Sequence, residues 1–158
     1  MPKPHTGEAG AGGFDADAVA NDMSPCNNLA LRQAARHVSQ IYDRHMAEAG
    51  LRGSQYSILS KLGRLGALPI GKLAEVMVLE RTALGRALGP LERDKLVFVG
   101  PGPDGRTRSV RLTPAGQARL KEAAVHWRNA QKEFEGQFGS SESQALRETL
   151  HRVVKVVG

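Results

Sequence analysis

Residues that could recognise another molecule gather in the stretch Leu79–Leu112. A segment with helical spacing carries Arg81 and Arg86, and an expected hairpin carries Arg106 and Arg108 near its tip. Arginine can bond guanine O6 and N7 together in a major groove, and it can also enter a narrow minor groove. We interpret the stretch as a unit that grips a DNA duplex, with a helix in one groove and a hairpin at its flank.

The candidate DNA contacts extend beyond these four arginines. Thr82 can place its methyl group against a thymine methyl, and Gly85 lets the helix backbone approach the groove floor. Lys72, near the start of the preceding short helix, suits a phosphate. Each arginine could instead be a solvated side chain, or a phosphate clamp without sequence preference. The full set is Lys72, Arg81, Thr82, Leu84, Gly85, Arg86, Asp104, Arg106, Thr107 and Arg108.

The formal net charge of the 158-residue chain is +6, and the whole excess lies in one segment. Between Leu51 and Ala115 there are eleven Lys and Arg against five Asp and Glu, whereas the rest of the chain has eleven of each. The alternative is a generic basic protein whose charges are placed at random, for which flanks that balance to zero are not expected. The distribution therefore favours one module that faces nucleic acid.

Other kinds of chemistry find little support in the sequence. There is no Gly-rich phosphate loop and no nucleophile elbow, so we predict that the protein is not an enzyme. The single cysteine, Cys26, excludes an internal disulfide and a cysteine-rich metal site. The histidines form no close ligand motif, so we expect neither a metal nor a cofactor. They are His5, His37, His45, His126 and His151.

Hydrophobic periodicity predicts the elements that would position the basic residues. Residues 1–23 are rich in Gly, Ala and Pro, which predicts a flexible arm. A long helix is expected to end at Gly50, and a second helix is expected to start at Ser54 as its N-cap and to end at Gly66. Further helices are expected over about 70–78, 81–94, 114–139 and 140–157, with strands over about 96–99 and 107–112.

Two short helices joined by a turn, the second of them basic, form the helix-turn-helix pattern. The Asp104-Gly105 pair predicts a hairpin directly after it, and Thr113-Pro114 predicts a new helix start. We therefore expect a mainly α fold with a small β wing, that is, a winged helix-turn-helix over 51–113. The apolar faces of 24–50 and 114–158 are left over, and they predict dimerisation helices that pair two copies on a pseudo-palindrome.

Several motifs resemble the MarR family of bacterial transcriptional regulators over about Cys26 to Val157. The wing motif Asp104-Gly105-Arg106-Thr107-Arg108, followed closely by Leu112-Thr113-Pro114-Ala115-Gly116, is the most specific part. The resemblance also rests on the motifs Leu31-Arg32, Tyr42-Asp43, Gly50-Leu51, Gln55-Tyr56, Ile70-Gly71-Lys72-Leu73-Ala74-Glu75, Arg81-Thr82-Ala83-Leu84 and Pro90-Leu91-Glu92-Arg93.

The resemblance implies a homodimer that binds operator DNA, usually as a repressor, and releases it on a small-molecule or oxidative signal. It also implies that Asp104 braces the turn or the wing arginine rather than touching DNA. The reading helix departs from the family pattern, since Ala83, Gly85 and Ala87 stand where polar residues are usual. Fewer polar groups on this face predict fewer direct base contacts.

A small-molecule effector would bind where the family places its pocket, between the dimer helices and the DNA-reading lobes. The expected ligand is an aromatic or phenolic acid, or its coenzyme A conjugate. The candidate lining residues combine aromatic walls with polar groups. They are Arg36, Tyr42, His45, Gln55, Tyr56 and Trp127.

Two alternatives remain open on the sequence. One is a winged-helix module that binds protein partners and never touches DNA. The other is a repressor that senses oxidants through Cys26, which lies about two residues upstream of the family's usual peroxide-sensing cysteine. No apolar run approaches the length of a membrane span, and no secretory signal is visible, so we expect a cytoplasmic protein.

Overall fold

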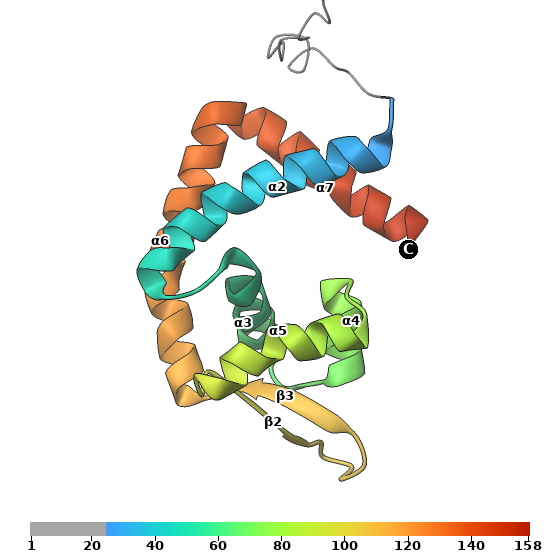
Figure 1. The fold of residues 1–158 in the computed structure, drawn as a ribbon, viewed down its shortest axis with the longest axis vertical. Helices are drawn as coiled ribbons and strands as arrows, with labels where there is room; N and C mark the ends of the chain where they lie inside the picture. The colour runs from blue at the N-terminus through green and yellow to red at the C-terminus, as the bar shows by residue number, and fades with distance from the viewer. Residues whose placement is uncertain (1–24) are drawn as a thin grey trace, which may run out of the picture. The chain divides into compact units, whose positions relative to one another are not determined.

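A computed structural model describes residues 25–158, and the predicted N-terminal arm therefore lies outside the described residues. Helices dominate the fold, and three short strands form a single sheet (Figure 1). The elements are α2 (Asn27–Met46), η1 (Ala47–Ala49), α3 (Gly53–Leu65), β1 (Leu68–Pro69), α4 (Ile70–Met77), α5 (Arg81–Arg93), β2 (Val97–Pro101), β3 (Arg108–Leu112), α6 (Pro114–Phe138) and α7 (Ser140–Val157).

The chain divides into two compact units, one up to Ala34 and one from Ala35 to Gly158. In the described part of the first unit, the backbone is helical from Asn27 onward, and Cys26 accepts a hydrogen bond from the Leu29 amide at 3.5 Å. The second unit holds the remainder of α2, the sheet and the other helices. The interface described below lies wholly within this second unit.

The junction between α2 and α3 differs from the sequence prediction at its cap. The prediction of Gly50 as a stop is confirmed, because this residue adopts the left-handed conformation with φ 65°. Ser54 as the N-cap of α3 is wrong. The helix starts two residues earlier, because the Arg52 amide donates to the Gln55 side chain at 2.8 Å and the Gly53 amide donates to Asp43 at 2.7 Å.

The hydrophobic core is built from one stripe on each helix of the winged domain. Ile58, Leu59 and Leu62 of α3 are buried, and Leu73 and Ala74 of α4 face the same core. On α5 the buried stripe consists of Leu84, Leu88 and Leu91, as their spacing of three and four residues predicts. The core leaves the opposite side of α5 exposed, and this is the side that carries its basic residues.

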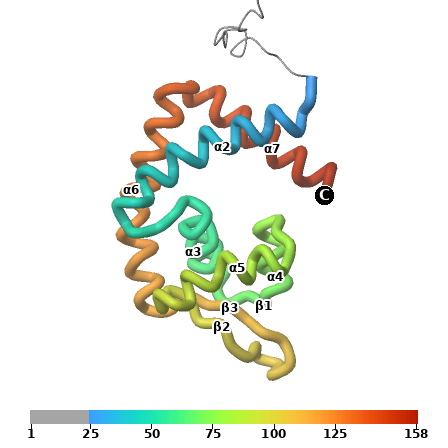
Figure 2. Tube along the Cα trace, in the orientation of Figure 1, coloured from blue at the N-terminus to red at the C-terminus, as the bar shows by residue number. Residues whose placement is uncertain are grey.

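The sheet has the strand order β1-β3-β2, so that the strand leaving the hairpin is central (Figure 2). β3 pairs antiparallel with β2 from Val97↔Leu112 to Pro101↔Arg108, and with the short β1 through Leu68↔Val110. The predicted hairpin is confirmed, and β1 adds a short edge strand to it. Because β1 leads directly into α4, the first helix of the helix-turn-helix is joined to the wing by backbone hydrogen bonds.

Two long helices complete the second unit. The predicted start of α6 is confirmed, since the Thr113 hydroxyl accepts a hydrogen bond from the Gly116 amide at 3.0 Å and Pro114 occupies the first turn. α7 starts at Ser140, as its predicted range has it, and its N-cap residue is Gly139, without a side-chain cap bond. Ser143 instead donates from its hydroxyl to the Gly139 carbonyl.

Candidate nucleic-acid interface

An open cleft of about 490 Å³ lies between α4, the start of α5 and the wing. It is lined by four of the residues that the sequence singled out as DNA contacts, although they come from three separate elements. These residues are Lys72, Arg81, Thr107 and Arg108. The fold therefore gathers a lysine, two arginines and a hydroxyl on one face, which suits the phosphates of a nucleic-acid backbone.

Arg81 packs against Gly71, a residue of the family motif to which the sequence gave no role of its own. A Cβ atom added to Gly71 would lie 3.0 Å from the Arg81 Nη2, so the guanidinium packs directly against this glycine. Glu75 lines the same cleft and pairs with Lys72 at 2.7 Å. The hydrogen bond and charge of Lys72 lower the pKa of Glu75, so this carboxylate partly offsets the positive charge of the cleft. Both Gly71 and Glu75 belong to the family motif Ile70-Gly71-Lys72-Leu73-Ala74-Glu75, which was the sequence feature that pointed to them.

The outward side of α5 is exposed and carries few large side chains. Thr82, Gly85 and Arg86 are exposed, and a Cβ atom added at Gly85 would find no neighbour within 4 Å. Leu84, which we had included among the DNA contacts, is fully buried. That assignment is wrong for its side chain, because Leu84 anchors α5 to the core and fixes which side of the helix faces outward.

The Asp104 carboxylate braces the wing tip, together with backbone hydrogen bonds from the Gly102 amide to Thr107 and from the Gly105 amide to Gly102. Asp104 Oδ1 accepts hydrogen bonds from the Arg106 amide at 3.0 Å, the Thr107 amide at 2.9 Å and the Thr107 hydroxyl at 2.8 Å. The bonds from Thr107, followed by that from Arg106, lower the pKa of Asp104. Asp104 thus braces the turn through its backbone, and it leaves the exposed Arg106 side chain at the tip.

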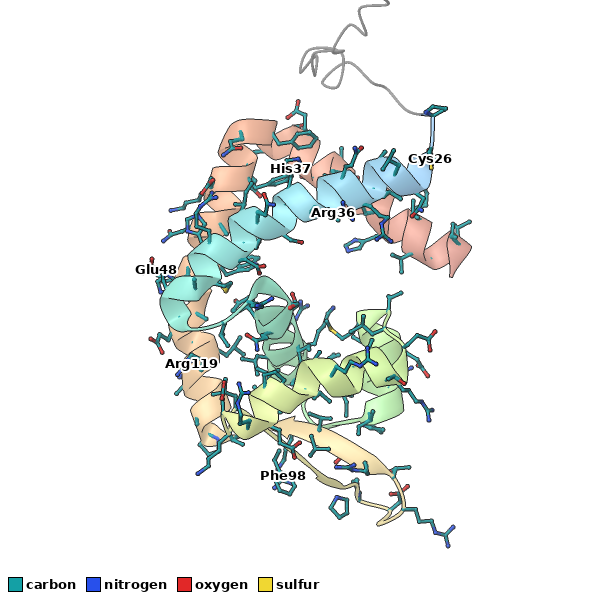
Figure 3. The ribbon with its side chains drawn as sticks, in the orientation of Figure 1. Cys26, Arg36, His37, Glu48, Phe98 and Arg119 are labelled. Carbon is teal, nitrogen blue, oxygen red and sulfur yellow. The ribbon has the colours of Figure 1, made fainter. Side chains whose placement is uncertain are left out.

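The outer face of the wing carries a cation–π contact that the sequence did not reveal. The Arg111 guanidinium lies 4.4 Å from the centre of the Phe98 ring, and the two residues are direct partners across β2 and β3. Phe98 is labelled on the wing in Figure 3. Phe98 also covers Gly100, because a Cβ atom there would overlap its ring. The attraction between this cation and the ring adds to the pairing of β2 with β3.

Three of the six candidate effector residues are divided between two cavities of the described part of the chain. Tyr42 lines a cavity of about 320 Å³ between α2 and α3, whereas Tyr56 and Trp127 line another of about 280 Å³ between α3 and α6. Gln55 is used as the cap of α3, and Arg36 is exposed on α2 (Figure 3). His45 is engaged in a polar cluster at the α2–α6 junction.

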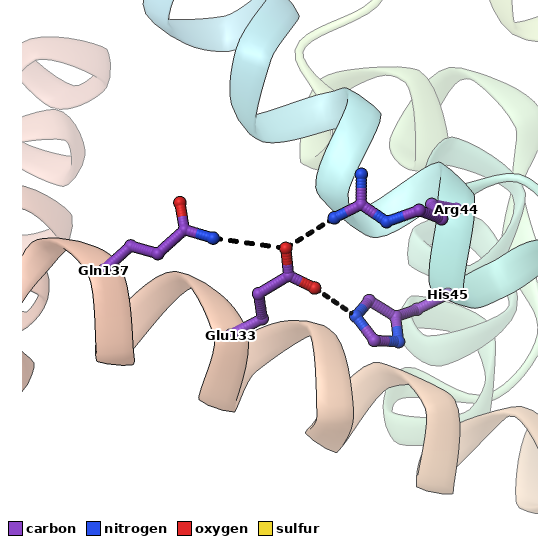
Figure 4. Close-up of polar contacts among 4 residues, drawn as sticks. All are labelled: Arg44, His45, Glu133 and Gln137. Atoms are coloured by element: carbon purple, nitrogen blue, oxygen red, sulfur yellow. Dashed lines mark hydrogen bonds and ion pairs between the residues drawn. The ribbon is translucent and has the colours of Figure 1, made fainter.

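That cluster centres on Glu133 of α6 (Figure 4). One carboxylate oxygen accepts from Arg44 and from Gln137, and the other lies 2.7 Å from His45 Nε2. The His45 hydrogen bond is the largest cause of a lowered pKa of Glu133. One turn away, the Tyr42 hydroxyl donates to the Gln131 side chain, so α2 and α6 are tied twice.

The α3–α6 cavity contains basic residues that the sequence reading missed. The rings of Tyr56 and Trp127 are stacked with centroids 6.3 Å apart, and Lys61 and Arg64 complete the lining together with Ser57 and Ser60. Burial raises the pKa of Tyr56, and nearby Arg128 acts in the opposite direction. The sequence feature that could have indicated these basic residues is the spacing of four between Tyr56, Ser60 and Arg64, which places them on one face of α3.

Two negative findings concern only residues 25–158. No helix in this part of the chain is both long and apolar enough to cross a membrane. Within the same residues, no group of three His, Cys, Asp or Glu side chains is arranged to hold a metal ion.

Comparison with known proteins finds no matching family model and no match among curated proteins. Solved structures match well. The transcriptional regulator MosR of M. tuberculosis, in a complex with DNA, is 32% identical, and the alignment covers 84% of this chain and 96% of that chain with a TM-score of 0.75. The chain belongs to the MarR family of transcriptional regulators.

Other members of the MarR fold match over similar lengths. PcaV of Streptomyces coelicolor, solved with its natural ligand, is 19% identical with a TM-score of 0.75, and the alignment covers 87% of this chain and 97% of that chain. BpsR of Bordetella bronchiseptica is 21% identical with a TM-score of 0.70, and 80% and 96% are covered. The predicted MarR-type winged helix-turn-helix is thereby confirmed, and the family consists of transcriptional regulators rather than enzymes.

Proposed function

We propose that this MarR-family protein acts as a homodimer that represses transcription from a pseudo-palindromic operator and leaves it when a small aromatic acid binds. The observation that carries the proposal is the cleft in which Lys72, Arg81, Thr107 and Arg108 lie together. MosR, which has the same fold and 32% identity, has been solved in a complex with DNA.

In this proposal α5 enters the major groove and the wing lies along the flanking backbone. The exposed Thr82, Gly85 and Arg86 face the bases, and Arg106 enters the minor groove from the tip that Asp104 holds. Lys72 and Arg108 contact phosphates. The confined positive charge supplies the salt-dependent part of the affinity.

The second copy would pack on the C-terminal helix. Several valines near the end of α7 are exposed, among them Val156 at 75% and Val157 at 79%. An unpaired apolar stripe of this kind is costly to leave in water, and a two-fold partner would cover it with its own copy. The two α5 helices would then read half-sites about one helical turn apart.

We place the effector in the α3–α6 cavity of Tyr56 and Trp127. The Trp127 side chain remains 37% exposed, so a planar ring can pack on it without displacing the core. Lys61 and Arg64 line the same cavity and no carboxylate does, which favours an anionic ligand. A volume of about 280 Å³ suits a small aromatic acid better than a whole coenzyme A conjugate.

The α2–α3 cavity is a poorer site for such an acid. Asp43 is the only charged residue that lines it, and its carboxylate already accepts the Gly53 amide. An incoming carboxylate would meet this negative charge without a compensating cation. In support of an aromatic acid, the DNA binding of BpsR, which shares the fold, is regulated by 6-hydroxynicotinic acid.

DNA binding is tested by fluorescence anisotropy with labelled duplexes from upstream of the protein's own gene. We expect tight binding of a dimer that weakens steeply as salt is raised from about 50 to 200 mM. Absence of binding at low salt, with a folded dimer confirmed by light scattering, would rule the function out and favour a protein-interaction module.

The effector site is tested by thermal shift with a panel of hydroxylated benzoic and nicotinic acids. An acid that raises the melting temperature of the wild type should lose this effect in Trp127→Leu and in the double variant Lys61→Gln, Arg64→Gln. The matched control is Asp43→Asn in the other cavity, which should respond like the wild type. If only Asp43→Asn lost the rise in melting temperature, the effector site would be assigned to the α2–α3 cavity instead.

A further inference from the structure

The helix α5 contains a proline at a position where it changes the hydrogen bonding of the backbone. Pro90 lies inside the helix, which continues to Arg93. Proline has no amide hydrogen, so the carbonyl of the residue four positions earlier lacks its ordinary helical donor. That carbonyl belongs to Arg86. One main-chain acceptor in the middle of α5 is therefore available to a donor from outside the helix.

The Arg86 carbonyl lies on the outward side of α5. Arg86 and Gly89 are both exposed, and they fall on the face opposite the buried Leu84, Leu88 and Leu91. Helical side chains lean toward the N-terminus, so the Arg86 side chain points away from its own carbonyl. The residues that could cover this carbonyl are those that follow it.

The Pro90 ring lies beside this carbonyl in place of the missing donor, and the other following residues do not cover it. Gly89 has no side chain, and a Cβ atom added there would find no neighbour within 4 Å. Arg93, one turn further on, is turned toward Asp94, with its Nε 3.3 Å from the Asp94 carboxylate. Gly85 is equally open on the preceding turn. The backbone of α5 can thus approach another surface closely over two turns.

The chemistry of the major groove indicates which donor would meet this acceptor. Cytosine N4 and adenine N6 present amino groups there, whereas guanine O6 and thymine O4 present acceptors that a carbonyl would repel. A single free carbonyl can therefore discriminate between bases without a polar side chain. This matters for α5, because Ala83, Gly85, Ala87 and Gly89 offer no side-chain hydrogen bonds.

We propose that the Arg86 main-chain carbonyl, freed by Pro90 and exposed by Gly89, reads the amino group of one cytosine or adenine in each operator half-site. This inference rests on the proposed DNA binding, since it requires α5 to lie in the major groove. The proposed contact would add base specificity through a main-chain atom rather than through a side chain. Pro90 and Gly89 act as positioning residues for this contact and do not touch the base themselves.

The test uses the full-length protein and the operator that the wild type binds. Each adenine is replaced in turn by purine and each cytosine by 2-pyrimidinone, which removes the exocyclic amino group. Affinities are then compared for the wild type and for Pro90→Ala, which restores an amide donor to the Arg86 carbonyl. Any effect of the analogue on the duplex itself is common to both proteins and cancels in the ratio.

We expect the wild type to lose about twofold to tenfold in affinity at one position of each half-site, the range of one hydrogen bond. Pro90→Ala should lose less at that position, and Gly89→Leu, which covers the carbonyl, should behave likewise. Pro114→Ala, a proline removal at the start of α6, is the control and should match the wild type. Equal losses for the wild type and Pro90→Ala at every position would overturn the inference, whereas failure of the wild type to bind any operator would overturn the proposed function instead.

Discussion

His45 on α2 and Glu133 on α6 are joined by a contact of 2.7 Å between Nε2 and Oε2, across 88 positions of sequence. Arg44, the neighbour of His45, binds the other oxygen of the same carboxylate. One acidic side chain thus receives two cationic or donor groups from successive residues of the facing helix. The α2–α6 junction is therefore fixed by charge as well as by packing.

Replacing Glu133 by Gln should loosen this junction and lower the melting temperature by a few degrees at neutral pH. The pKa of Glu133 is lowered below its ordinary value of 4.5, chiefly by the His45 hydrogen bond. Because the carboxylate has a lower pKa in the folded state than in the unfolded state, its contacts stabilise the fold at pH values above 4.5. This stabilisation is lost as the pH falls through the folded-state pKa. Melting curves of both proteins between pH 3.5 and 8 would check this, because the gap between them should close only at the acid end. Glu122→Gln, whose partner Arg119 lies on the same helix, is the control and should have little effect.

Gly116, in the first turn of α6, should tolerate no side chain. A Cβ atom there would overlap the Leu96 carbonyl, which belongs to the backbone and cannot move away easily. Gly116→Ala should therefore cost about 1–3 kcal/mol of unfolding free energy. Gly136→Ala, on the same helix with open space around it, should stabilise by about 0.5–1 kcal/mol. Urea denaturation of the two variants measures both changes in the free energy of unfolding. Equal changes would show that helix propensity alone determines the effect of alanine at these positions.

Arg106→Ala should weaken operator binding about tenfold and reduce the slope of log affinity against log salt by about one. The side chain is exposed at the wing tip, so the melting temperature should stay at the wild-type value. Anisotropy titrations at several salt concentrations give both quantities. Lys155→Ala removes the same charge from the end of α7 and should leave the slope unchanged. A large drop in melting temperature for Arg106→Ala would instead assign this arginine a structural role.

Asp104→Ala should act on the operator indirectly, by releasing three donors of the wing tip. We expect operator affinity to fall about threefold to tenfold, because the tip must then be ordered on binding. The pKa of Asp104 is lowered below 3.8 by its bonds from Thr107 and Arg106, so the brace is fully present at neutral pH and is lost only as the pH falls below that value. Amide exchange at Arg106 and Thr107 would report the loosening. Unchanged exchange in the variant would mean that other contacts hold the tip.

The sequence predicted those features that depend on local chemistry. Thr113-Pro114 marked the start of α6, Gly50 marked the end of the first helix, and the spacing of Leu84, Leu88 and Leu91 gave the buried side of α5. The motif that ends in Gly116 indicated the family, and the structure adds a reason for that glycine in its closeness to Leu96.

Features that depend on distant partners were not predictable in the same way. The start of α3 moved from Ser54 to Arg52 because the Gly53 amide reaches Asp43, ten positions earlier on another helix. His45 and Tyr42 looked like ligand-binding groups, but their partners on α6 could not be known from spacing alone. Leu84 shows a different error, because its spacing placed it in the buried stripe of α5 and we nevertheless counted it among the DNA contacts.

The two outer strands of the sheet each carry a proline, Pro69 in β1 and Pro101 in β2. Proline offers no amide to a further strand, and β1 is only two residues long. Both edges are therefore poor templates for the sheet-to-sheet association that leads to aggregates. Copies of the protein at high concentration therefore have little tendency to join through their wings.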